Sequence, residues 1–376
     1  MERLQKQAIV KDLDTKMVIL TGPRQVGKTT LAKSLSTAWA NLEYLNWDSG
    51  KDRKIMLRQE WNRKAGLLIL DEFHKLKNWK SRIKGAYDTE GIPPRILITG
   101  SARLDLYRRG SDSLAGRYFL HRLYPLSVAE LKAQSRSPRE TLQQLMILGG
   151  FPEPLFSQSE EYSKRWRKQH LERIIREDIQ DLEPIKNISS LILLVDLLRE
   201  RVGSRISYSS LAEDLQVSPH TVKHWIQILE HMYVLFVVTP YHRNLARAIL
   251  KEPKIYFYDT GAVTGDTGAK LENVIAVCLR KWLHFLEDTK GKNTQLCYVR
   301  DKEKREVDFL VEIDRKIDFL IEVKVSEANL SKPLLRFHNK LKPRESVQLV
   351  EATTRTKTVQ GISITSAADW LAKLDI

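Results

Sequence analysis

The chain has 376 residues, which is enough for about two or three domains that each bury a core of their own. Hydrophobic residues make up 42% of it, as in globular proteins. Its longest apolar runs, Leu191 to Leu198 and Tyr233 to Val238, fall far short of the roughly 20 residues that cross a membrane. The N-terminal MERLQKQ is charged and no apolar stretch follows it. We therefore expect no signal peptide, no membrane partner and a cytoplasmic location.

The chain is strongly basic. Lys and Arg number 62 against 47 Asp and Glu, which gives a net charge of +15. Such a charge attracts polyanions and favours DNA as a partner, with salt-sensitive binding, although a solvated basic surface is the alternative. The two cysteines, Cys278 and Cys297, lie in apolar patterns without a CxxC spacing, so we expect buried free thiols.

The first motif in chain order is TGPRQVGKTT, which follows the apolar run Met17 to Leu20. It fills every fixed position of the GxxxxGK[ST] phosphate loop. Backbone N–H groups of such a loop surround an anion, and the start of the next helix adds partial positive charge. We predict that Lys28 contacts the β and γ phosphates of ATP and that the Thr29 hydroxyl faces Mg²⁺. The residues expected to bind the nucleotide in this loop are Gly22, Pro23, Arg24, Gln25, Val26, Gly27, Lys28, Thr29 and Thr30.

Between residues 16 and 126, short apolar stretches alternate with helix-length polar segments, which predicts a parallel sheet with crossover helices. The predicted strands are Met17 to Leu20, Glu43 to Asn46, Leu67 to Leu70 and Arg95 to Ile98. The third ends in LLILDE, at the edge where ligands of such sheets bind. We predict that Asp71 binds the nucleotide through Mg²⁺ and that Glu72 is catalytic and polarises the attacking water. The alternative is a turn with two solvated acids.

The fourth strand ends in ILITGSARL, which brings Thr99 and Ser101 beside the nucleotide if this strand neighbours the phosphate-loop strand. A hydroxyl there would sense the γ phosphate, although Ser and Thr are also ordinary turn residues. Further on, Arg117 is the predicted catalytic arginine finger, in the same subunit or in a neighbouring one of a homo-oligomer. Arg122 is the competing choice.

The middle of the chain has two features. A helix over Pro138 to Leu148 ends at GGFPEP, and a charged helical stretch follows as a connector. Ile206 to Tyr241 then predicts a short helix, a turn, a second helix and a strand, which together make a winged helix-turn-helix. In the major groove, Lys223 of the second helix would contact a phosphate, and Gln227 or His224 would lie near the base edges. The alternative is that this module contacts a protein.

The C-terminal region predicts a hairpin of Arg305 to Ile313 and Lys316 to Val325, in which Asp308 lies nearly opposite Glu322. Glu322 and Lys324 are two residues apart and project to one side. This layout is typical of PD-(D/E)xK phosphodiesterases, in which two carboxylates hold Mg²⁺ and the lysine activates water. Glu272, on the preceding helix, is the predicted third acidic residue at the metal. The alternative is a salt-bridged hairpin with a solvated face.

Five segments, GPRQVGKTTL, LILDEFHKLKNW, ILITGSARL, LAGRYFLHRLYPLSVAEL and LGGFPEP, resemble successive signatures of prokaryotic AAA-type ATPases whose C-terminal half is a domain of unknown function. The resemblance implies an α/β chain with three parts. These are a P-loop parallel-sheet ATPase domain over 1–135, a helical connector and winged helix-turn-helix over 136–250, and an α/β, restriction-endonuclease-like PD-(D/E)xK domain over 251–376.

The resemblance also implies that Lys28 and Thr29 bind ATP and Mg²⁺, with Asp71 as the second-motif acid and Glu72 as the catalytic carboxylate. On this basis we expect an ATP hydrolase that couples nucleotide state to DNA binding or to Mg²⁺-dependent DNA cleavage by Asp308, Glu322 and Lys324. The rival hypothesis is a nucleotide-gated switch or adaptor that binds a protein partner and carries an inactive nuclease-like domain.

Overall fold

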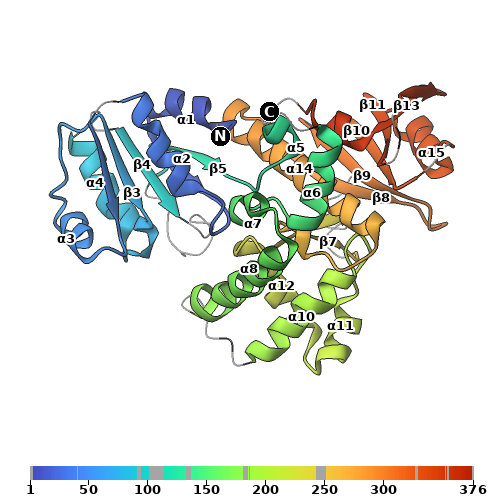
Figure 1. Ribbon diagram of the computed structural model, residues 1–376, viewed down its shortest axis with the longest axis horizontal. Helices are drawn as coiled ribbons and strands as arrows, with labels where there is room; N and C mark the ends of the chain where they lie inside the picture. Colours follow the sequence, from blue (N-terminus) through green and yellow to red (C-terminus); the bar gives the residue numbers. More distant parts are fainter. Residues whose placement is uncertain are drawn as a thin grey trace. The chain divides into compact units, whose positions relative to one another are not determined.

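The computed structural model describes residues 3–39, 41–90, 95–100, 114–132, 137–180, 185, 187–242, 251–326, 329–351, 353 and 355–374 (Figure 1). The chain divides into two compact units, Met1–Tyr124 and Pro125–Ile376. Each unit has its own β-sheet. None of the helices in the described ranges is long and apolar enough to cross a membrane.

The first unit is built around a five-stranded, fully parallel sheet with the strand order β2-β3-β4-β1-β5. Its strands are β1 (Met17–Thr21), β2 (Leu42–Asn46), β3 (Leu67–Asp71), β4 (Arg95–Gly100) and β5 (Tyr118–Arg122). Its helices are α1 (Gln5–Leu13), α2 (Lys28–Ser34), η1 (Leu35–Thr37), α3 (Gly50–Arg58), η2 (Phe73–Lys75) and α4 (Trp79–Glu90). The predicted parallel sheet and its four strand segments are therefore confirmed.

The central strands are short and apolar because helices cover both faces of the sheet. Every residue of β1 and β3 is buried, which leaves no solvent-facing row and explains why these strands read as continuous apolar runs. Since all five strands are parallel, their carboxyl ends meet at one edge. Thr21, Asp71 and Gly100 end β1, β3 and β4 there.

The second unit begins with helices and continues into a larger mixed sheet. Its first helices are α5 (Val128–Leu131), α6 (Pro138–Leu148), α7 (Pro152–Ser157), α8 (Glu160–Arg173), the π-helix η4 (Ile174–Ile179), α10 (Ile188–Glu200), α11 (Tyr208–Leu215) and α12 (Pro219–His231). A capping box between Ser137 and Glu140 starts α6, and Gly149 ends it with a φ of 85°.

Helices α11 and α12 pack on each other. Their assignment to a winged helix-turn-helix stays a prediction. The cap of α11 is Ser207, because its hydroxyl accepts from the Ser210 N–H. Ser218 caps α12 in the same way, and Pro219 occupies the first helical position. Val222, Ile226 and Leu229 of α12 are buried.

The mixed sheet has eight strands in the order β12-β13-β11-β10-β9-β8-β6-β7. They are β6 (Leu235–Pro240), β7 (Lys254–Phe257), β8 (Thr294–Arg300), β9 (Glu306–Ile313), β10 (Lys316–Lys324), β11 (Glu345–Val350), β12 (Lys357–Val359) and β13 (Ile362–Ser366). The helices of this part are η5 (Thr260–Ala262), α14 (Thr267–Lys290), α15 (Lys332–Leu341) and α16 (Ala367–Leu371). The predicted β9–β10 hairpin is confirmed.

Helices cover both faces of this sheet, which Figure 1 shows in orange and red. Phe319 packs edge-on against Trp282 of α14 and Trp370 of α16. The next residue, Leu320, points to the opposite face and shares a core cluster with Leu334 and Phe337 of α15. This layering buries the middle of β10 on both sides.

Helix α14 is fixed to α5 by a buried ion pair. Lys281 and Glu130 are fully buried and in contact, and the Lys281 ammonium also donates to the Pro125 carbonyl at 3.1 Å. Cys278, on the same helix, and Cys297 on β8 are buried free thiols, as predicted.

Strands β6 and β7 belong to the same sheet as the C-terminal strands, because β6 pairs with β7 and, in parallel, with β8. The predicted boundary at residue 250 lies between these two paired strands. The division of the chain into three domains stays a prediction.

Candidate functional site

The phosphate loop connects β1 to α2 and has a backbone that favours glycine. Gly22 and Gly27 have φ values of 148° and 99°, a region that residues with a side chain rarely adopt. A Cβ on Gly22 would lie 2.1 Å from the carbonyl oxygen of Leu123. The first glycine of the motif is therefore required by packing as well as by backbone conformation.

The loop already contains its cation. Lys28 is 6% exposed, and its ammonium donates to the carbonyls of Gly22 at 3.0 Å and Pro23 at 2.6 Å. These bonds hold Nζ over the loop at the start of α2. A phosphate that entered the loop would meet this charge together with the N–H groups at the helix start.

Asp71, at the end of β3, lies directly beside the motif threonine. The Thr29 hydroxyl donates to Asp71 Oδ2 at 2.9 Å, and Tyr44 of β2 donates to the same oxygen at 2.6 Å. Burial raises the pKa of Tyr44 to about 12, and its bond to Asp71 adds to that effect. A hydroxyl in contact with a buried carboxylate supplies two oxygen ligands of the kind that Mg²⁺ prefers.

Thr99 contacts the second carboxylate oxygen of Asp71. Strand β4 lies between β1 and β3. It therefore neighbours the phosphate-loop strand, as the predicted position of Thr99 beside the nucleotide requires. The Thr99 hydroxyl is fully buried and donates to Asp71 Oδ1. Ser101 lies outside the described residues, and its sensor role stays a prediction.

Glu72 follows Asp71 in a left-handed conformation with a φ of 57°. Its carboxylate lies 3.7 Å from Lys75 Nζ and 3.8 Å from His74 Nε2. Burial raises the pKa of Glu72, and the charges of Lys28 and Lys75 counter only part of that rise. A carboxylate with a raised pKa accepts a proton from water more readily than a solvated one.

Arg117 is not placed to reach the nucleotide of its own chain. It precedes β5, and the register pairs Met17 with Tyr118 and Thr21 with Arg122. Arg117 therefore lies at the amino end of the sheet, about 16 Å along the strand from the loop edge. Its guanidinium binds Asp88 at 2.6 and 2.9 Å. Arg122, the competing choice, lies at the loop edge.

The N-terminal segment forms hydrogen bonds both to the phosphate loop and to the end of the first unit. Arg3 donates to the Val26 carbonyl at 3.1 Å and also to the Tyr124 carbonyl. The Leu123 N–H donates to the Thr21 carbonyl at 2.8 Å. Thus the start of the phosphate loop is bonded directly to the short segment that follows β5, and Arg3 connects the middle of the loop to the same segment.

Residues 14–132 match the family model described as AAA domain, and they contain the loop, Asp71 and Glu72 in this geometry. Residues 14–132 are an AAA domain. The following residues match two families of unknown function, DUF8612 over 139–270 and DUF4143 over 267–370. The AAA domain and the DUF4143 domain together confirm the family resemblance that the motifs indicate.

Prokaryotic proteins match the chain at low identity. A protein of Mycobacterium tuberculosis is 29% identical over 65% of this chain and 54% of its own length, so the chain spans about half the length of that relative. A protein of Methanocaldococcus jannaschii is 26% identical over 93% of this chain and 80% of its own length. Both relatives are described as uncharacterized.

Solved structures of ATPases resemble the chain weakly. The Walker-type ATPase of Pyrococcus abyssi is 17% identical, covers 69% of this chain and 93% of its own, and gives a TM-score of 0.42. The Thermotoga maritima RuvB Holliday junction branch migration motor is 18% identical, covers 63% of this chain and 89% of its own, and gives a TM-score of 0.33.

Beyond the AAA domain, the predicted C-terminal acids gather around a lysine that the sequence analysis did not consider. Lys254, on β7, is 1% exposed. Its ammonium lies 2.9 Å from Glu306, 3.2 Å from Glu272 and 3.6 Å from Asp308. Burial alone would lower the pKa of Lys254, but the three carboxylates outweigh it and raise that pKa.

Glu272 is the most constrained of these acids. Its Oε1 accepts from Lys254 and from the Tyr256 hydroxyl at 2.5 Å. Burial, followed by repulsion from Asp308, raises the pKa of Glu272 to about 7. The carboxyl group of Asp308 accepts from the Val323 N–H at 2.8 Å, which ties β9 to β10 beside Glu322.

Glu322 and Lys324 project to one side of β10, as predicted. Lys324 Nζ lies 2.8 Å from Glu322 Oε1, and the Ser331 hydroxyl donates to the same oxygen at 3.1 Å. Glu322 Oε2 is buried and has no hydrogen-bond partner within the part of the chain that the structure describes. Burial, followed by repulsion from Asp308, raises the pKa of Glu322 to about 7.

This set of acids does not fit a Mg²⁺ site as arranged. No group of three or more His, Cys, Asp or Glu side chains in the described ranges is placed to hold a metal. Glu272 Oε1 and Asp308 Oδ1 both contact the Lys254 ammonium instead. A compact cation therefore already balances the carboxylates that were predicted to bind the metal.

Proposed function

We propose that the chain hydrolyses Mg²⁺-ATP in its AAA domain and that the bound nucleotide controls DNA binding by the rest of the chain. The contact between the Thr29 hydroxyl and Asp71 at 2.9 Å, directly beside buried Glu72, supports the hydrolysis most strongly. It joins the two halves of a nucleotide site, which are 42 residues apart in the sequence.

The residues present fit Mg²⁺ at this position, since Asp71 and Thr29 supply a buried carboxylate and a hydroxyl side by side. When bound, the metal would neutralise charge on the β and γ phosphates. Lys28 would turn from the loop carbonyls to the phosphates. Glu72 would orient the attacking water and take its proton, which its raised pKa favours.

Three variants test this assignment. Lys28→Ala should lose ATP binding by at least about tenfold, because a charge-assisted contact is removed. Glu72→Gln should still bind ATP with Mg²⁺ but should lower kcat by at least about a hundredfold. Glu60→Gln, an exposed acid of the same unit, is the matched control and should leave both unchanged. Full turnover by Glu72→Gln would overturn the role of Glu72.

DNA is the proposed partner because the chain carries a net charge of +15 and because α12 exposes Lys223 and Gln227 on the face away from its core. The winged helix-turn-helix is part of this proposal. The nucleotide state would act through the segment after β5, since Leu123 is bonded to Thr21 and Arg3 connects Val26 of the loop to Tyr124.

Mg²⁺-dependent cleavage of DNA at Asp308, Glu322 and Lys324 is the second candidate, and it requires Asp308 to exchange its contact with Lys254 for the metal. The unpartnered, buried Glu322 Oε2 favours it, whereas the position of Lys254 favours a nuclease-like domain that binds without cutting. Incubation with single-stranded, double-stranded and branched DNA and Mg²⁺ decides between them. DNA cutting that disappears in Asp308→Ala would establish cleavage at this site. Substrates that stay intact would support a nuclease-like domain that binds DNA without cutting it.

Arg117 keeps one proposed role, as a finger toward the nucleotide of a neighbouring copy in a homo-oligomer. Its pairing with Asp88 would have to open in that assembly. An Arg117→Ala variant whose ATP turnover no longer rises with protein concentration would support this role.

A further inference from the structure

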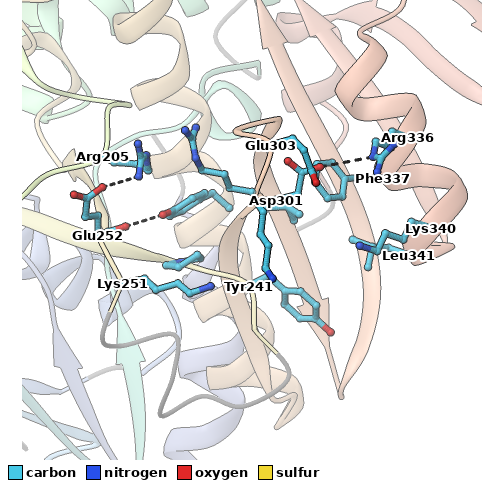
Figure 2. Close-up of a pocket in the computed structure, with 15 residues that line it drawn as sticks. Arg205, Tyr241, Lys251, Glu252, Asp301, Glu303, Arg336, Phe337, Lys340 and Leu341 are labelled. Atoms are coloured by element: carbon cyan, nitrogen blue, oxygen red, sulfur yellow. Dashed lines mark hydrogen bonds and ion pairs between the residues drawn. The ribbon is translucent and has the colours of Figure 1, made fainter.

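A cavity with a volume of about 780 Å³ lies in the second unit. Two of its lining residues, Tyr298 and Arg300, adjoin the group of acids around Lys254. Figure 2 shows Arg205, Lys251 and Glu252 on one side of the cavity and α15, with Arg336 and Lys340, on the other. The turn between β8 and β9 forms its third wall. A cavity of this volume is within the range that holds a small ligand or one unit of a polymer.

The charges of the lining are unequal. Six cationic side chains line the cavity against three acidic ones. The three arginines already have carboxylate partners, in the pairs Arg205–Glu252, Arg300–Glu306 and Arg336–Asp301. The acids of the wall are thereby largely neutralised, so the remaining charge of the cavity is that of its lysines.

Lys251, Lys302 and Lys340 are exposed, and none of them makes an ion pair or a hydrogen bond with another residue in the described ranges. They come from three separate segments: the residues before β7, the β8–β9 turn and the end of α15. Three ammonium groups that converge on one cavity without carboxylate partners suit a ligand with several negative charges.

The cavity also has an apolar part. Tyr241 and Leu341 are half-buried and pack against the core cluster under α15. The Tyr241 N–H donates to the Tyr298 carbonyl at 2.7 Å, which fixes the backbone that carries the ring. An aromatic ring held in this way beside free cations combines a surface for stacking with sites for phosphate.

We propose that this cavity binds one nucleotide of a single-stranded nucleic acid, with the base against Tyr241 and the flanking phosphates on Lys251, Lys302 and Lys340. A base within a duplex is stacked and cannot enter a cavity, so the site selects unpaired strands. This assignment rests on the proposed function in one respect: it takes nucleic acid as the partner of the chain.

The test uses the full chain without ATP and a fluorescent oligothymidylate, with binding followed by anisotropy as salt is varied. Replacing all three lysines by alanine should weaken binding by at least about tenfold at low salt. It should also reduce the slope of log K against log salt by about 2, which corresponds to three phosphate contacts on a single strand. The control replaces Lys290, Lys316 and Lys332, which are exposed elsewhere on the same unit, and removes the same charge.

The aromatic contact has its own readout. Tyr241→Ala should lose about tenfold in affinity with an unchanged salt slope, because stacking is lost and no charge is removed. Tyr241→Phe should bind as the wild type does, since the stacking face is kept.

Each other outcome counts against the proposal in a distinct way. Equal losses in the two triple variants, or no loss in Tyr241→Ala, would overturn the site while nucleic acid stays a partner. Competition by duplex DNA or by polyglutamate as strong as by unlabelled oligothymidylate would overturn the preference for unpaired strands. No binding by the wild type would overturn the site together with the DNA half of the proposed function, and ATP hydrolysis would be untouched.

Discussion

Replacing Lys254 with methionine tests whether this lysine holds the C-terminal acids together. Methionine has a similar length and keeps most of the packing, but it removes the charge. The ammonium lies 2.9 to 3.6 Å from three carboxylates. At an effective dielectric constant of about 20, each such contact is a gross attraction of about 5 kcal/mol. Most of this is offset by desolvation, and deleting one partner of a buried pair costs about 3–5 kcal/mol net.

The loss should depend on pH. In the wild type, the pKa of Glu272 is already raised to about 7 by burial and by Asp308. An acid whose pKa is raised in the folded state binds more protons there than in the unfolded state, so stability falls as pH rises from its ordinary pKa to its folded one. Without Lys254 the pKa of Glu272 rises further. The destabilisation should therefore be larger at pH 8 than at pH 6.

Hydrogen exchange of peptides from β7, β9 and β10 measures this loss locally, which matters because a chain of two units does not unfold in one step. Exchange should accelerate by about a hundredfold or more at pH 8. The control Lys324→Met removes a half-exposed lysine from Glu322 and should accelerate exchange much less. Equal exchange in wild type and Lys254→Met at pH 8, or the same acceleration at both pH values, would refute the reasoning.

Three further variants address the AAA domain and the core of the second unit. Lys75→Met removes a charge that lowers the pKa of Glu72, so the acid limb of kcat/KM for ATP should move to higher pH; an unmoved limb would argue against Glu72 as the proton acceptor. Gly22→Ala should abolish ATP binding, because its Cβ would meet a backbone oxygen, whereas Gly50→Ala, with open space around its Cβ, should bind ATP normally in the same titration. Lys281→Met leaves its buried acidic partner without a cation, so urea unfolding of the second unit should show a loss of about 3–5 kcal/mol; a loss below about 1 kcal/mol would contradict this.

The AAA domain was predictable because its motifs are local. The loop is a contiguous run of ten residues, and Asp71 and Glu72 lie at the end of an apolar strand whose residues are all buried. The position of Arg117 could not be predicted from local sequence. Its distance from the loop depends on which strand β5 joins and in which direction, and parallel pairing with β1 puts it at the far edge.

Lys254 was missed for a related reason. Its partners Glu306 and Asp308 are more than fifty residues away and reach it only through the order of strands in the mixed sheet. A signal was nevertheless present, because a lysine opens the otherwise aromatic and apolar strand KIYF. A charge in such a strand requires a buried partner. Tyr44, which binds Asp71 from β2, depends on register in the same way.

The bonds of the phosphate loop to the segment after β5 have a mechanical consequence. Arg3 joins Val26 to Tyr124, and the Gly22 backbone is packed against Leu123. Tyr124 is also the last residue before the second unit begins. In the proposed coupling, a displacement of the loop by an incoming triphosphate would therefore reach Tyr124, the residue next to the start of the second unit, through these bonds.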